Sequence, residues 1–461
     1  MKVITRDKSF YKTLIALAIP TALQNLISFL VTFADNLMVS PLGDAAVSGV
    51  YMGGQVQTFL QVFTVGIEGT IVILSSQYWG KGEKEPIKTV SSTGLHFSLA
   101  TGIVIMTLCL IMPDKIVGIF TDDASVIESG TAYLQTVCLS YPFFCLTQSL
   151  VASMRSVETA RLGMVVSLFS LTSDVILNYL LIEGHFGCPA LGTRGAALAT
   201  LASRIIETAV TLIFVLKLDK KLRFRLRDFL RTDSALRRDF IRYGLPLVGG
   251  QVIWAINLMG NSVIMGHFDR EVITAVSMAN TMNTLAYVVM NGMSGAVGII
   301  TGKTIGAGKT ELVKEYARTV QIIFLCLGFL TGGTIALLKA PFISLYSGVS
   351  AEAASFSRQF ITVLSITAIG TCYQAAGLFG LVKSGGDVSF VFRNDSIFVL
   401  GVVLPSAIIA SHLGAAPWIV YACLKCDQIL KCFVAVVKIN RFNWMKNLTR
   451  NTQEERTEEN G

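Results

Sequence analysis

The sequence predicts an all-α membrane protein with twelve transmembrane helices in two homologous six-helix lobes. The first observation behind this prediction is composition. Of the 461 residues, 52% are hydrophobic and only 15% are charged, whereas soluble proteins average about 25% charged residues. The second is an internal repeat at a shift of 226 residues, which places Pro20 on Pro246. Two copies of one apolar unit are typical of alternating-access transporters.

The repeat keeps its register without a gap over the first three predicted spans of each lobe. Residues 66–69 (Gly-Ile-Glu-Gly) fall on residues 292–295 (Gly-Met-Ser-Gly), and residues 77–82 fall on residues 303–308. The matching prolines, Pro20 and Pro246, sit at equal depth in the first helix of each lobe. Proline favours a bend in a helix, so both are candidate hinges, although a bend without a mechanical role fits equally well.

Helices that cross the hydrocarbon core need about 20 apolar residues. Nine uncharged stretches reach that length, and the repeat predicts three more that contain charges but are otherwise apolar. The nine are 13–34, 45–67, 89–113, 129–154, 243–268, 272–302, 319–338, 359–382 and 396–424, and the three are 162–183, 195–217 and 414–437. The first stretch is too long for a cleaved signal peptide and has a counterpart in the second lobe.

The predicted organisation has four parts. The N-terminal lobe covers residues 1–217 and the C-terminal lobe residues 240–440. A basic cytoplasmic linker, 218–239, joins them, either as an amphipathic helix on the anionic membrane surface or as a plain connector. The polar tail 441–461 is expected to be disordered and cytoplasmic.

The net charge of +8 indicates membrane topology rather than nucleic-acid binding. On the twelve-span model, 30 of the 38 Lys and Arg residues lie on the side that holds both termini, and 5 lie on the opposite side. Cytoplasmic loops carry the excess of positive charge in membrane proteins. Both termini are therefore predicted to be cytoplasmic.

Polar stripes follow three predicted spans of the first lobe. An ionisable side chain at bilayer depth is costly unless it is paired or hydrated, and no basic residue is close in sequence to these acids. Each acid could thus exchange a proton or hold a cation, or it could cap neighbouring backbone or face a wet vestibule. The stripes are Gln24, Ser28 and Asp35 in span 1, Gln57, Gln61, Thr64 and Glu68 in span 2, and Asp174 and Asn178 in span 5.

The second lobe is rich in asparagine and methionine instead. Amides and flexible thioethers suit a cavity for varied flat or amphipathic molecules, although any one of them could equally be a packing residue. Several are expected on one face of span 8. The candidate cavity residues, with Gln57 and Gln61 of the first lobe, are Asn257, Asn261, Asn280, Asn283, Tyr287, Asn291, Met282 and Met290.

Other charged and cysteine-containing patterns favour simpler explanations. Arg204 and Glu207, and Asp427 and Lys431, have opposite charges at spacings that allow pairing within a helix. The sequence Gly308-Lys309-Thr310 lacks the glycine at position 303 and the preceding strand that a phosphate-binding loop needs. The Cys423/Cys426 pair lacks the further ligands of a zinc site, so no metal or cofactor is predicted.

The chain resembles the multidrug and toxic compound extrusion (MATE) family over nearly its whole length. The order of several motifs, together with the duplication, makes the resemblance fairly specific. The motifs are Ile19-Pro20, Asp35-Asn36-Leu37-Met38-Val39, Gln77-Tyr78-Trp79-Gly80-Lys81-Gly82, Asn178-Tyr179-Leu180-Leu181-Ile182, Gly195-Ala196-Ala197 and Lys383-Ser384-Gly385-Gly386-Asp387.

The resemblance implies a coupling site in the first lobe. One branch of the family uses acids of spans 7 and 10, but Trp254 and Cys372 stand at those places here. The DNA-damage-inducible-like branch uses a first-lobe cluster. The residues that match it are Asp35, Gln148 at the place of the span 4 amide, Asp174 and Asn178 with their types exchanged, and Thr200. These departures leave the coupling ion open.

The sequence therefore predicts a monomeric multidrug efflux antiporter in the inner membrane of a prokaryotic cell. It would export organic, often cationic, compounds in exchange for protons or sodium, with Asp35, Asp174, Asn178, Gln148, Thr200 and Glu68 as candidate coupling residues. The partners implied are small-molecule substrates and the bilayer, not nucleic acid. The rival functions are a lipid-linked precursor flippase of the same superfamily and a membrane-embedded enzyme or receptor.

Overall fold

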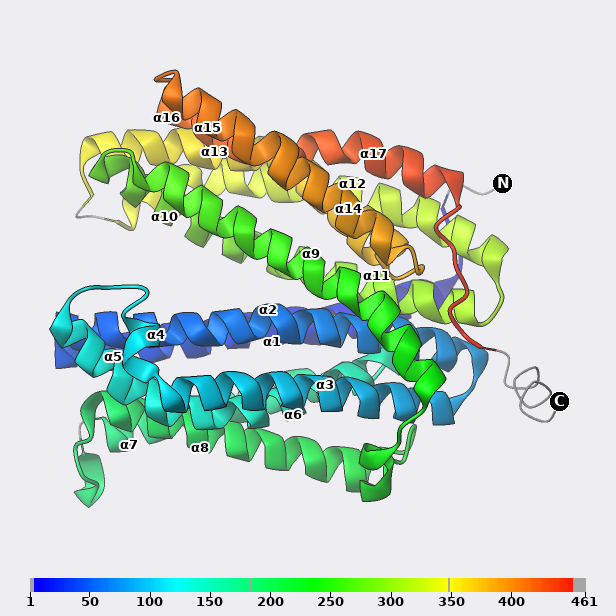
Figure 1. Cartoon of the computed structure of the whole chain (residues 1–461). Coiled ribbons are helices and arrows are strands. Elements are labelled where there is room, and N and C mark those ends of the chain that lie inside the picture. Colours follow the sequence, from blue (N-terminus) through cyan, green and yellow to red (C-terminus); the bar gives the residue numbers. More distant parts are fainter. Residues whose placement is uncertain (1–3, 183, 347–348, 451–461) are drawn as a thin grey trace. The chain divides into compact units, whose positions relative to one another are not determined.

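The computed structural model describes residues 4–182, 184–346 and 349–450. All regular elements in these ranges are helices, and no strand occurs there (Figure 1). The all-α prediction is confirmed. Ten helical segments are long and apolar enough to cross a membrane, and one bent helix pair forms an eleventh. The predicted twelfth span is occupied by two shorter consecutive helices, α16 and α17.

The helices follow the order of the predicted spans. In the first repeat they are α1 (Lys8–Val39), α2 (Asp44–Lys81), α3 (Lys84–Ile111), α4 (Pro113–Val117), α5 (Ala124–Val137), α6 (Tyr141–Ser156), α7 (Arg161–Leu181) and α8 (Gly192–Ile213). In the second they are α9 (Ser234–Gly266), α10 (Arg270–Ala286), α11 (Val288–Gly306), α12 (Thr310–Ser344), α13 (Ala351–Gln374), α14 (Val388–Phe398), α15 (Leu404–His412), α16 (Pro417–Leu424) and α17 (Asp427–Arg441).

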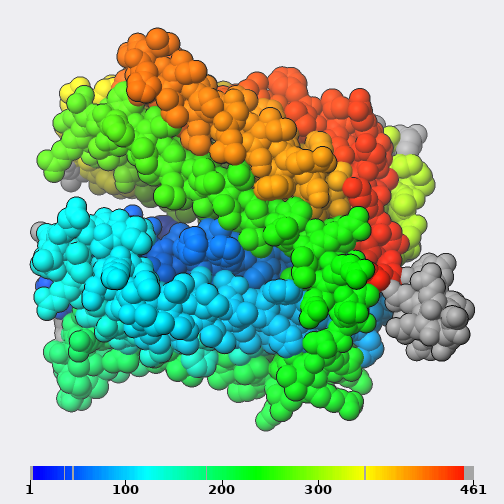
Figure 2. Space-filling view, in the orientation of Figure 1, coloured from blue at the N-terminus to red at the C-terminus, as the bar shows by residue number. Residues whose placement is uncertain are grey.

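Short π-helical and 3-10 segments interrupt or extend these helices. A π-helical segment, Val399–Val403, joins α14 to α15, and the rod Val388–His412 is visible as a continuous ridge in orange in Figure 2. A second π-helical segment, Ala375–Lys383, extends α13. Large apolar side chains lie exposed on the helices, for example Leu330 and Leu337 of α12. Such surfaces are suited to contact with lipid tails.

The helices form two compact units that do not coincide with the two repeats. Unit 1 combines Val252–Gly461 with Met1–Ala18 and Ile73–Lys84, and unit 2 combines Ile19–Val72 with Glu85–Gln251. Helices α1 and α9 each begin in one unit and continue in the other. Each unit thus contains the first turns of the opposite repeat's first helix.

In unit 1, the start of α1 packs on α12. The side chain of Asp7 accepts a hydrogen bond from the N–H of Ser9 at 2.8 Å, and the Tyr316 hydroxyl donates to Asp7 Oδ2 at 2.6 Å. The rings of Phe10 and Tyr316 lie 4.5 Å apart between centroids. The N–H of Thr5 also donates to Thr319 Oγ1 at 2.8 Å. These contacts fix the first turn of α1 within unit 1.

In unit 2, the start of α9 packs on α3 in an equivalent way. Asp233, which falls on Asp7 in the repeat, caps α9 by accepting from the N–H of Leu236 at 2.8 Å. A side chain that accepts from these free N–H groups stabilises a helix start. Phe240 then stacks on Phe97 of α3 with ring centroids 5.7 Å apart. The repeat therefore preserves both the cap and the exchanged packing.

The end of α2 crosses α11 within unit 1 at two glycines that the repeat relates. A Cβ atom on Gly80 would lie 1.9 Å from the carbonyl oxygen of Lys303, and one on Gly306 would lie 1.9 Å from that of Gln77. Gly80 falls on Gly306 and Gln77 falls on Lys303 in the repeat. The two contacts are therefore equivalent, and the helices meet backbone to backbone about a local twofold relation. This crossing gives the repeated glycines of residues 77–82 and 303–308 a structural role.

The segment after α17 is fixed to the same end of α2. Trp444 is completely buried, and its indole N–H donates to the carbonyl of Ile439 at 3.0 Å. The Gln77 side chain then accepts from the N–H of Leu448 at 2.7 Å and donates to the carbonyl of Lys446 at 3.2 Å. The prediction of disorder from residue 441 is therefore wrong for residues 441–450, which these contacts hold in place; residues 451–461 lie outside the described part of the chain.

Of the two alternatives for the linker 218–239, the amphipathic helix is wrong and the plain connector agrees with the structure. The segment contains only the end of a π-helical turn, a five-residue 3-10 helix at Leu226–Leu230 and the start of α9. The reason lies in Asp219, whose carboxylate accepts from the N–H groups of residues 221–223 at 2.8–3.1 Å. A side chain that binds the local backbone in this way favours a turn over a helix.

Ion pairs hold this linker against the start of α3 in unit 2. The fully buried carboxylate of Asp228 lies 3.3 Å from Lys88 Nζ and 2.7 Å from Arg231 Nε. Arg231 also pairs with Glu85. Burial alone raises the pKa of Asp228, but the N–H of Arg225, Lys88 and Arg231 lower it more, so this pKa lies below its usual value.

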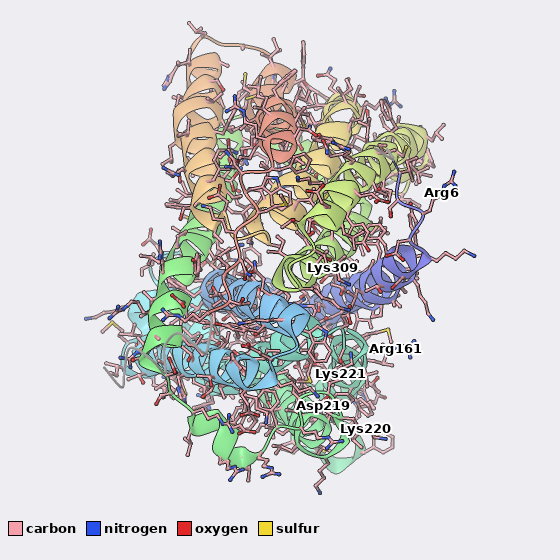
Figure 3. All side chains as sticks on the ribbon, turned by 90° about the vertical axis from the view of Figure 1, so that its right-hand side faces the viewer. Arg6, Arg161, Asp219, Lys220, Lys221 and Lys309 are labelled. Atoms are coloured by element: carbon pink, nitrogen blue, oxygen red, sulfur yellow. The ribbon has the colours of Figure 1, made fainter. Side chains whose placement is uncertain are left out.

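In unit 2, basic side chains of the predicted cytoplasmic loops lie at one end of the helices. Figure 3 looks onto this end, where Arg161, Lys220 and Lys221 belong to unit 2. Lys221 Nζ donates to the carbonyls of Val157 and Glu158 at 2.5 and 2.9 Å, which joins the linker to the end of α6. The loops after spans 4 and 6 thus meet on one side, as the topology prediction requires.

Candidate ion-coupling site

Helix α7 brings Asp174 and Asn178 to its buried face, one turn apart. Both residues are 1% exposed. The Asn178 amide nitrogen donates to Asp174 Oδ2 at 3.1 Å and to Asp35 Oδ1 of α1 at 2.8 Å. One amide therefore links two carboxylates from two helices. The predicted association of Asp35, Asp174 and Asn178 is present in the structure.

Helix α8 supplies a further contact that the sequence analysis did not predict. The Ser203 hydroxyl donates to Asp174 Oδ1 at 3.1 Å, and it also donates to the carbonyl of Thr200 at 2.9 Å. The helices can approach because a Cβ on Gly195 would lie only 2.2 Å from the carbonyl oxygen of Leu181. The available signal was that Ser203 lies one turn after Thr200 and one turn before Glu207.

Thr200 lies beside this cluster without a hydrogen bond from its hydroxyl to the two carboxylates. Its Oγ1 donates to the carbonyl of Ala196, one turn earlier in its own helix, at 3.1 Å. Gln148 of α6 is partly buried, and none of its hydrogen bonds within the described ranges reaches Asp35, Asp174 or Asn178. Of the residues implied by the family resemblance, three are therefore joined directly and two are not.

Arg204, a basic residue of α8 on the turn after Thr200, forms an ion pair with Glu207. Arg204 NH1 lies 2.6 Å from Glu207 Oε2, and the Ser170 hydroxyl donates to the same carboxylate at 3.3 Å. The predicted Arg204–Glu207 pairing is confirmed. Among the described residues, no Lys or Arg nitrogen lies within 4 Å of Asp35 or Asp174. Direct contacts to the linked carboxylates therefore come from neutral donors.

Glu68 belongs to a separate site. Its Oε2 accepts from Arg155 NH2 at 3.1 Å, and both side chains are largely buried between α2 and α6. Their separation in sequence, 87 residues, explains why no basic neighbour was visible in the span itself. Gln57 and Gln61 lie on the same helix, closer to its start; Gln57 is half-buried and Gln61 is exposed.

In unit 1, the candidate cavity residues of span 8 do not share one straight face. The span is a pair of helices, α10 and α11, bent by 44° at Tyr287. The Met282, Tyr287 and Met290 side chains are buried, whereas Asn280 and Asn291 are exposed. Asn283 is half-buried on α10, and Asn257 and Asn261 are half-buried on α9. The bend separates residues that a single helix would align.

The charged residues of α17 are paired, as predicted, but with an extra partner. Lys431 Nζ lies 3.0 Å from Asp427 Oδ2 and 2.9 Å from Asp395 Oδ1 of α14. All three side chains are at most 12% exposed. Lys425 lies with its Nζ 5.7 Å from the centre of the Tyr421 ring. Pairing of this kind compensates for burial of the charges.

The two candidate hinge prolines lie inside continuous helices. Pro20 is within α1 and Pro246 within α9. Pro20 stands directly after the point where α1 passes from unit 1, which ends at Ala18, into unit 2. Pro246 precedes the corresponding passage of α9, between Gln251 and Val252. Trp254, just beyond it, is exposed, and Cys372 of α13 is buried.

Duplicated membrane helices with a buried polar cluster are typical of the class of membrane transporters. The MatE family profile matches residues 20–180 and 246–409, and the chain therefore belongs to this family. The two matched segments begin at the residues that the internal repeat superimposes. The MATE resemblance inferred from the sequence is confirmed.

Curated relatives match most of the chain at low identity. The probable multidrug resistance protein NorM of Halalkalibacterium halodurans is 25% identical over 399 residues, covering 85% of this chain and 86% of its own length. The protein of the same name from Listeria innocua is 22% identical over 438 residues and covers 94% of each chain.

Solved structures share the fold. A MOP superfamily transporter from Pyrococcus furiosus superimposes with a TM-score of 0.83 at 18% identity, covering 95% of this chain and 99% of its own. The MATE transporter VcmN of Vibrio cholerae gives a TM-score of 0.84 at 14% identity, with 94% and 97% covered. The predicted architecture of two homologous six-helix lobes is thereby confirmed.

Proposed function

We propose that this chain is a secondary active multidrug efflux antiporter. It exports organic compounds, often cationic, by alternating access and takes up protons or sodium in exchange. The relatives named above, which carry multidrug resistance names, support the cargo class. The observation that carries the coupling mechanism is the pair of carboxylates, Asp35 and Asp174, which the Asn178 amide joins and which have no Lys or Arg nitrogen within 4 Å among the described residues.

The cluster has the chemistry of a reversible cation site. Two ionised carboxylates around one amide repel each other strongly where the dielectric constant is low. A proton or a small hard cation between them removes that repulsion. The side-chain oxygen of Asn178, Oδ1, is buried and accepts no hydrogen bond from any described residue, so it can accept from a protonated carboxyl or bind a cation. Oxygen ligands of these types are those that hard cations prefer.

Ion binding at this cluster is coupled to cargo release through α1. Asp35 lies on the same helix as Pro20, which stands where α1 changes unit. When the ion neutralises Asp35, the packing of α1 against α7 changes and cargo is released outward. The ion then leaves inward. One charge that crosses 100 mV supplies about 2.3 kcal/mol, enough for a roughly 50-fold concentration ratio of a neutral cargo in one-to-one exchange.

Other residues have supporting roles in this proposal. Thr200, beside the cluster, and Gln148 of α6 are secondary ligands, and the ion-paired Glu68 stabilises the lobe. The half-buried amides and buried thioethers of α9–α11 contribute to the cargo cavity. The protein acts as a monomer in the inner membrane of a prokaryotic cell with both termini in the cytoplasm, an orientation supported by the charge distribution of the loops.

Flux measurements in proteoliposomes test the coupling. The full chain is reconstituted, and efflux of a cationic dye is followed with an imposed proton gradient, a sodium gradient or neither. Wild-type protein is expected to concentrate dye only with the correct gradient, and Asp35→Asn is expected to lose this because the amide cannot take up a proton. The matched control is Asp122→Asn, an exposed acid of the same unit. Gradient-driven efflux by Asp35→Asn at the wild-type rate would contradict the proposed role.

A further inference from the structure

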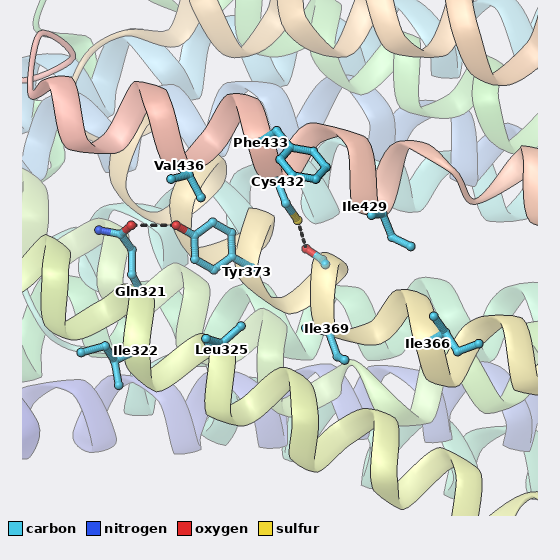
Figure 4. A pocket seen from close by; sticks show the side chains of 11 residues that line it. Gln321, Ile322, Leu325, Ile366, Ile369, Tyr373, Ile429, Cys432, Phe433 and Val436 are labelled. Atoms are coloured by element: carbon cyan, nitrogen blue, oxygen red, sulfur yellow. Dashed lines mark hydrogen bonds between the residues drawn. The ribbon is translucent and has the colours of Figure 1, made fainter.

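Unit 1 contains an apolar groove lined by α12, α13 and α17. These helices lie in the second repeat, whereas the carboxylate cluster lies in the first. Its volume is about 610 Å³. Figure 4 shows α17 and α12 along its two sides and α13 as its floor. The lining residues are Gln321, Ile322, Leu325, Ile366, Ile369, Gly370, Tyr373, Ile429, Cys432, Phe433 and Val436.

The floor is shaped by a glycine that brings α13 and α17 together. A Cβ on Gly370 would lie 2.0 Å from the carbonyl oxygen of Gln428, and Cys432 Sγ lies 3.4 Å from the carbonyl oxygen of Gly370. Most of the wall is hydrocarbon, and the rim faces outward: Phe433 is 69% exposed and Ile366 is 58% exposed. From Ile429 to Val436 the groove follows α17 for about 10 Å of helical rise. Its dimensions and chemistry suit a hydrocarbon chain.

One end of the groove is polar. The Tyr373 hydroxyl donates to Gln321 Oε1 at 2.7 Å, and the Asn440 amide donates to the same oxygen at 3.3 Å. The Gln321 amide nitrogen donates to the carbonyl of Ala317 at 3.1 Å. These bonds fix the ends of α12, α13 and α17 around one polar group. The groove thus has an apolar body and a defined polar mouth.

Beyond this mouth lies an excess of positive charge. The Arg318 guanidinium and the Lys314 ammonium lie over the Phe442 ring, at 5.9 and 6.0 Å from its centre. Lys314 is paired with Glu311 at 2.6 Å. By contrast, neither Arg318 nor the exposed Arg441 has a carboxylate within 4 Å in the described part of the chain. Two guanidinium groups are therefore free to bind an anion.

We propose that this groove binds one anionic phospholipid, with an acyl chain between α12 and α17 and the phosphate at Arg318 and Arg441. The outward rim opens toward the hydrocarbon region, and the free arginines match an anionic headgroup, since guanidinium binds phosphate in two-pronged geometry. The same charges disfavour a cationic cargo. This lipid site is independent of the proposed transport mechanism and does not depend on which ion is coupled.

Lipid retention measured by native mass spectrometry tests the proposal. The purified full chain is stripped of lipid and incubated with phosphatidylglycerol or phosphatidylcholine that carry the same acyl chains. Wild-type protein is expected to retain one phosphatidylglycerol with about 30-fold preference, since each of two arginines contributes about 1 kcal/mol toward an anionic headgroup. The double variant Arg318→Ala/Arg441→Ala is expected to lose the preference but not all binding. Its matched control is Arg358→Ala/Arg393→Ala, two exposed arginines of the same unit outside the groove.

A second experiment fills the groove with a larger side chain and measures lipid retention again. Leu325→Trp is expected to remove retention of both lipids, whereas Leu330→Trp, an exposed position on the same helix outside the lining, is expected to leave retention unchanged. Ile366→Trp at the other end replaces Leu325→Trp if that variant fails to fold. Equal retention of the two lipids by wild type would overturn the proposal. A preference for phosphatidylglycerol that persists in Leu325→Trp would also overturn it. One-for-one displacement of the lipid by tetraphenylphosphonium would overturn it too, because the groove would then be a cargo site.

Discussion

Asn178 holds the candidate coupling site together through a single nitrogen that donates to both Asp35 and Asp174. The spacing of Asp174 and Asn178 was enough to predict that they share a face, whereas Asp35, near the end of span 1, is only half-buried. Ser203 was not predictable in the same way, because its contact depends on how closely α7 and α8 approach at Gly195. Serine is also common on helices, so position alone did not distinguish it.

At the residue scale, the sequence mainly failed to predict ion pairs between residues that are distant in the chain. Arg155 and Glu68 are 87 residues apart in the chain, yet they form an ion pair at 3.1 Å. Asp395 reaches Lys431 from another helix in the same way. Helical periodicity identifies partners three or four residues away. It gives no information on which face of a second helix packs opposite, so these partners could not be assigned from the sequence.

Asp228 predicts a specific dependence of stability on pH. Its pKa in the folded protein lies below the usual 3.8, so its ionised form stabilises the folded state above about pH 4, and that stabilisation is lost as the pH falls through the folded-state pKa. Asp228→Asn is expected to lower the unfolding free energy at pH 7 by about 3 kcal/mol, the order for breaking a buried ion pair. Thermal unfolding in detergent from pH 7 to pH 3 should show the gap to wild type narrowing below pH 4. The exposed Asp122→Asn is the control, and a gap that stays constant across this range would contradict the assignment.

At the scale of whole elements, helix positions were more predictable than helix shapes. Apolar length located the spans because the bilayer sets a minimum length. The bend at Tyr287 was not predicted, since the sequence from 272 to 302 contains no proline and carries no charge. The basic composition of the linker could not decide between an amphipathic helix and a plain connector, because that decision depends on Asp219, which binds the backbone N–H groups of a turn.

The crossing of α2 and α11 predicts a strong effect of a single methyl group. Gly80→Ala places a Cβ against the carbonyl oxygen of Lys303, and backbone cannot move aside as a flexible side chain can. The variant is expected to lose about 3 kcal/mol or more, at the upper end of overpacking costs. Gly306→Ala should behave alike because its contact is equivalent. Gly295→Ala on α11 is the control, since no atom lies within 4 Å of its added Cβ. Equal melting temperatures for Gly80→Ala and Gly295→Ala would show that the crossing is not tight.

At the scale of the whole molecule, the charge distribution predicts which loops face each side of the membrane. Cys188 lies in the loop after span 5, on the side predicted to be external, whereas Lys220 lies in the linker on the opposite side. With the other cysteines replaced by serine, a membrane-impermeant maleimide is expected to label Cys188 in intact cells. Lys220→Cys, in a chain that also lacks Cys188, should be labelled only after the cells are made permeable. The reverse pattern would invert the predicted topology.

The exchanged starts of α1 and α9 bear on the ancestry of the chain. In this chain, the first turns of α1, up to Ala18, pack on helices of the second repeat. A single copy of the repeat would lack that packing surface. Two identical chains can each provide the missing surface by domain swapping, in which they exchange the same segment. If the chain arose by duplication and fusion, its ancestral subunit would have needed a second copy to provide that packing surface. Accordingly, two fragments cut within the linker should be obtained folded only when they are produced together in one cell.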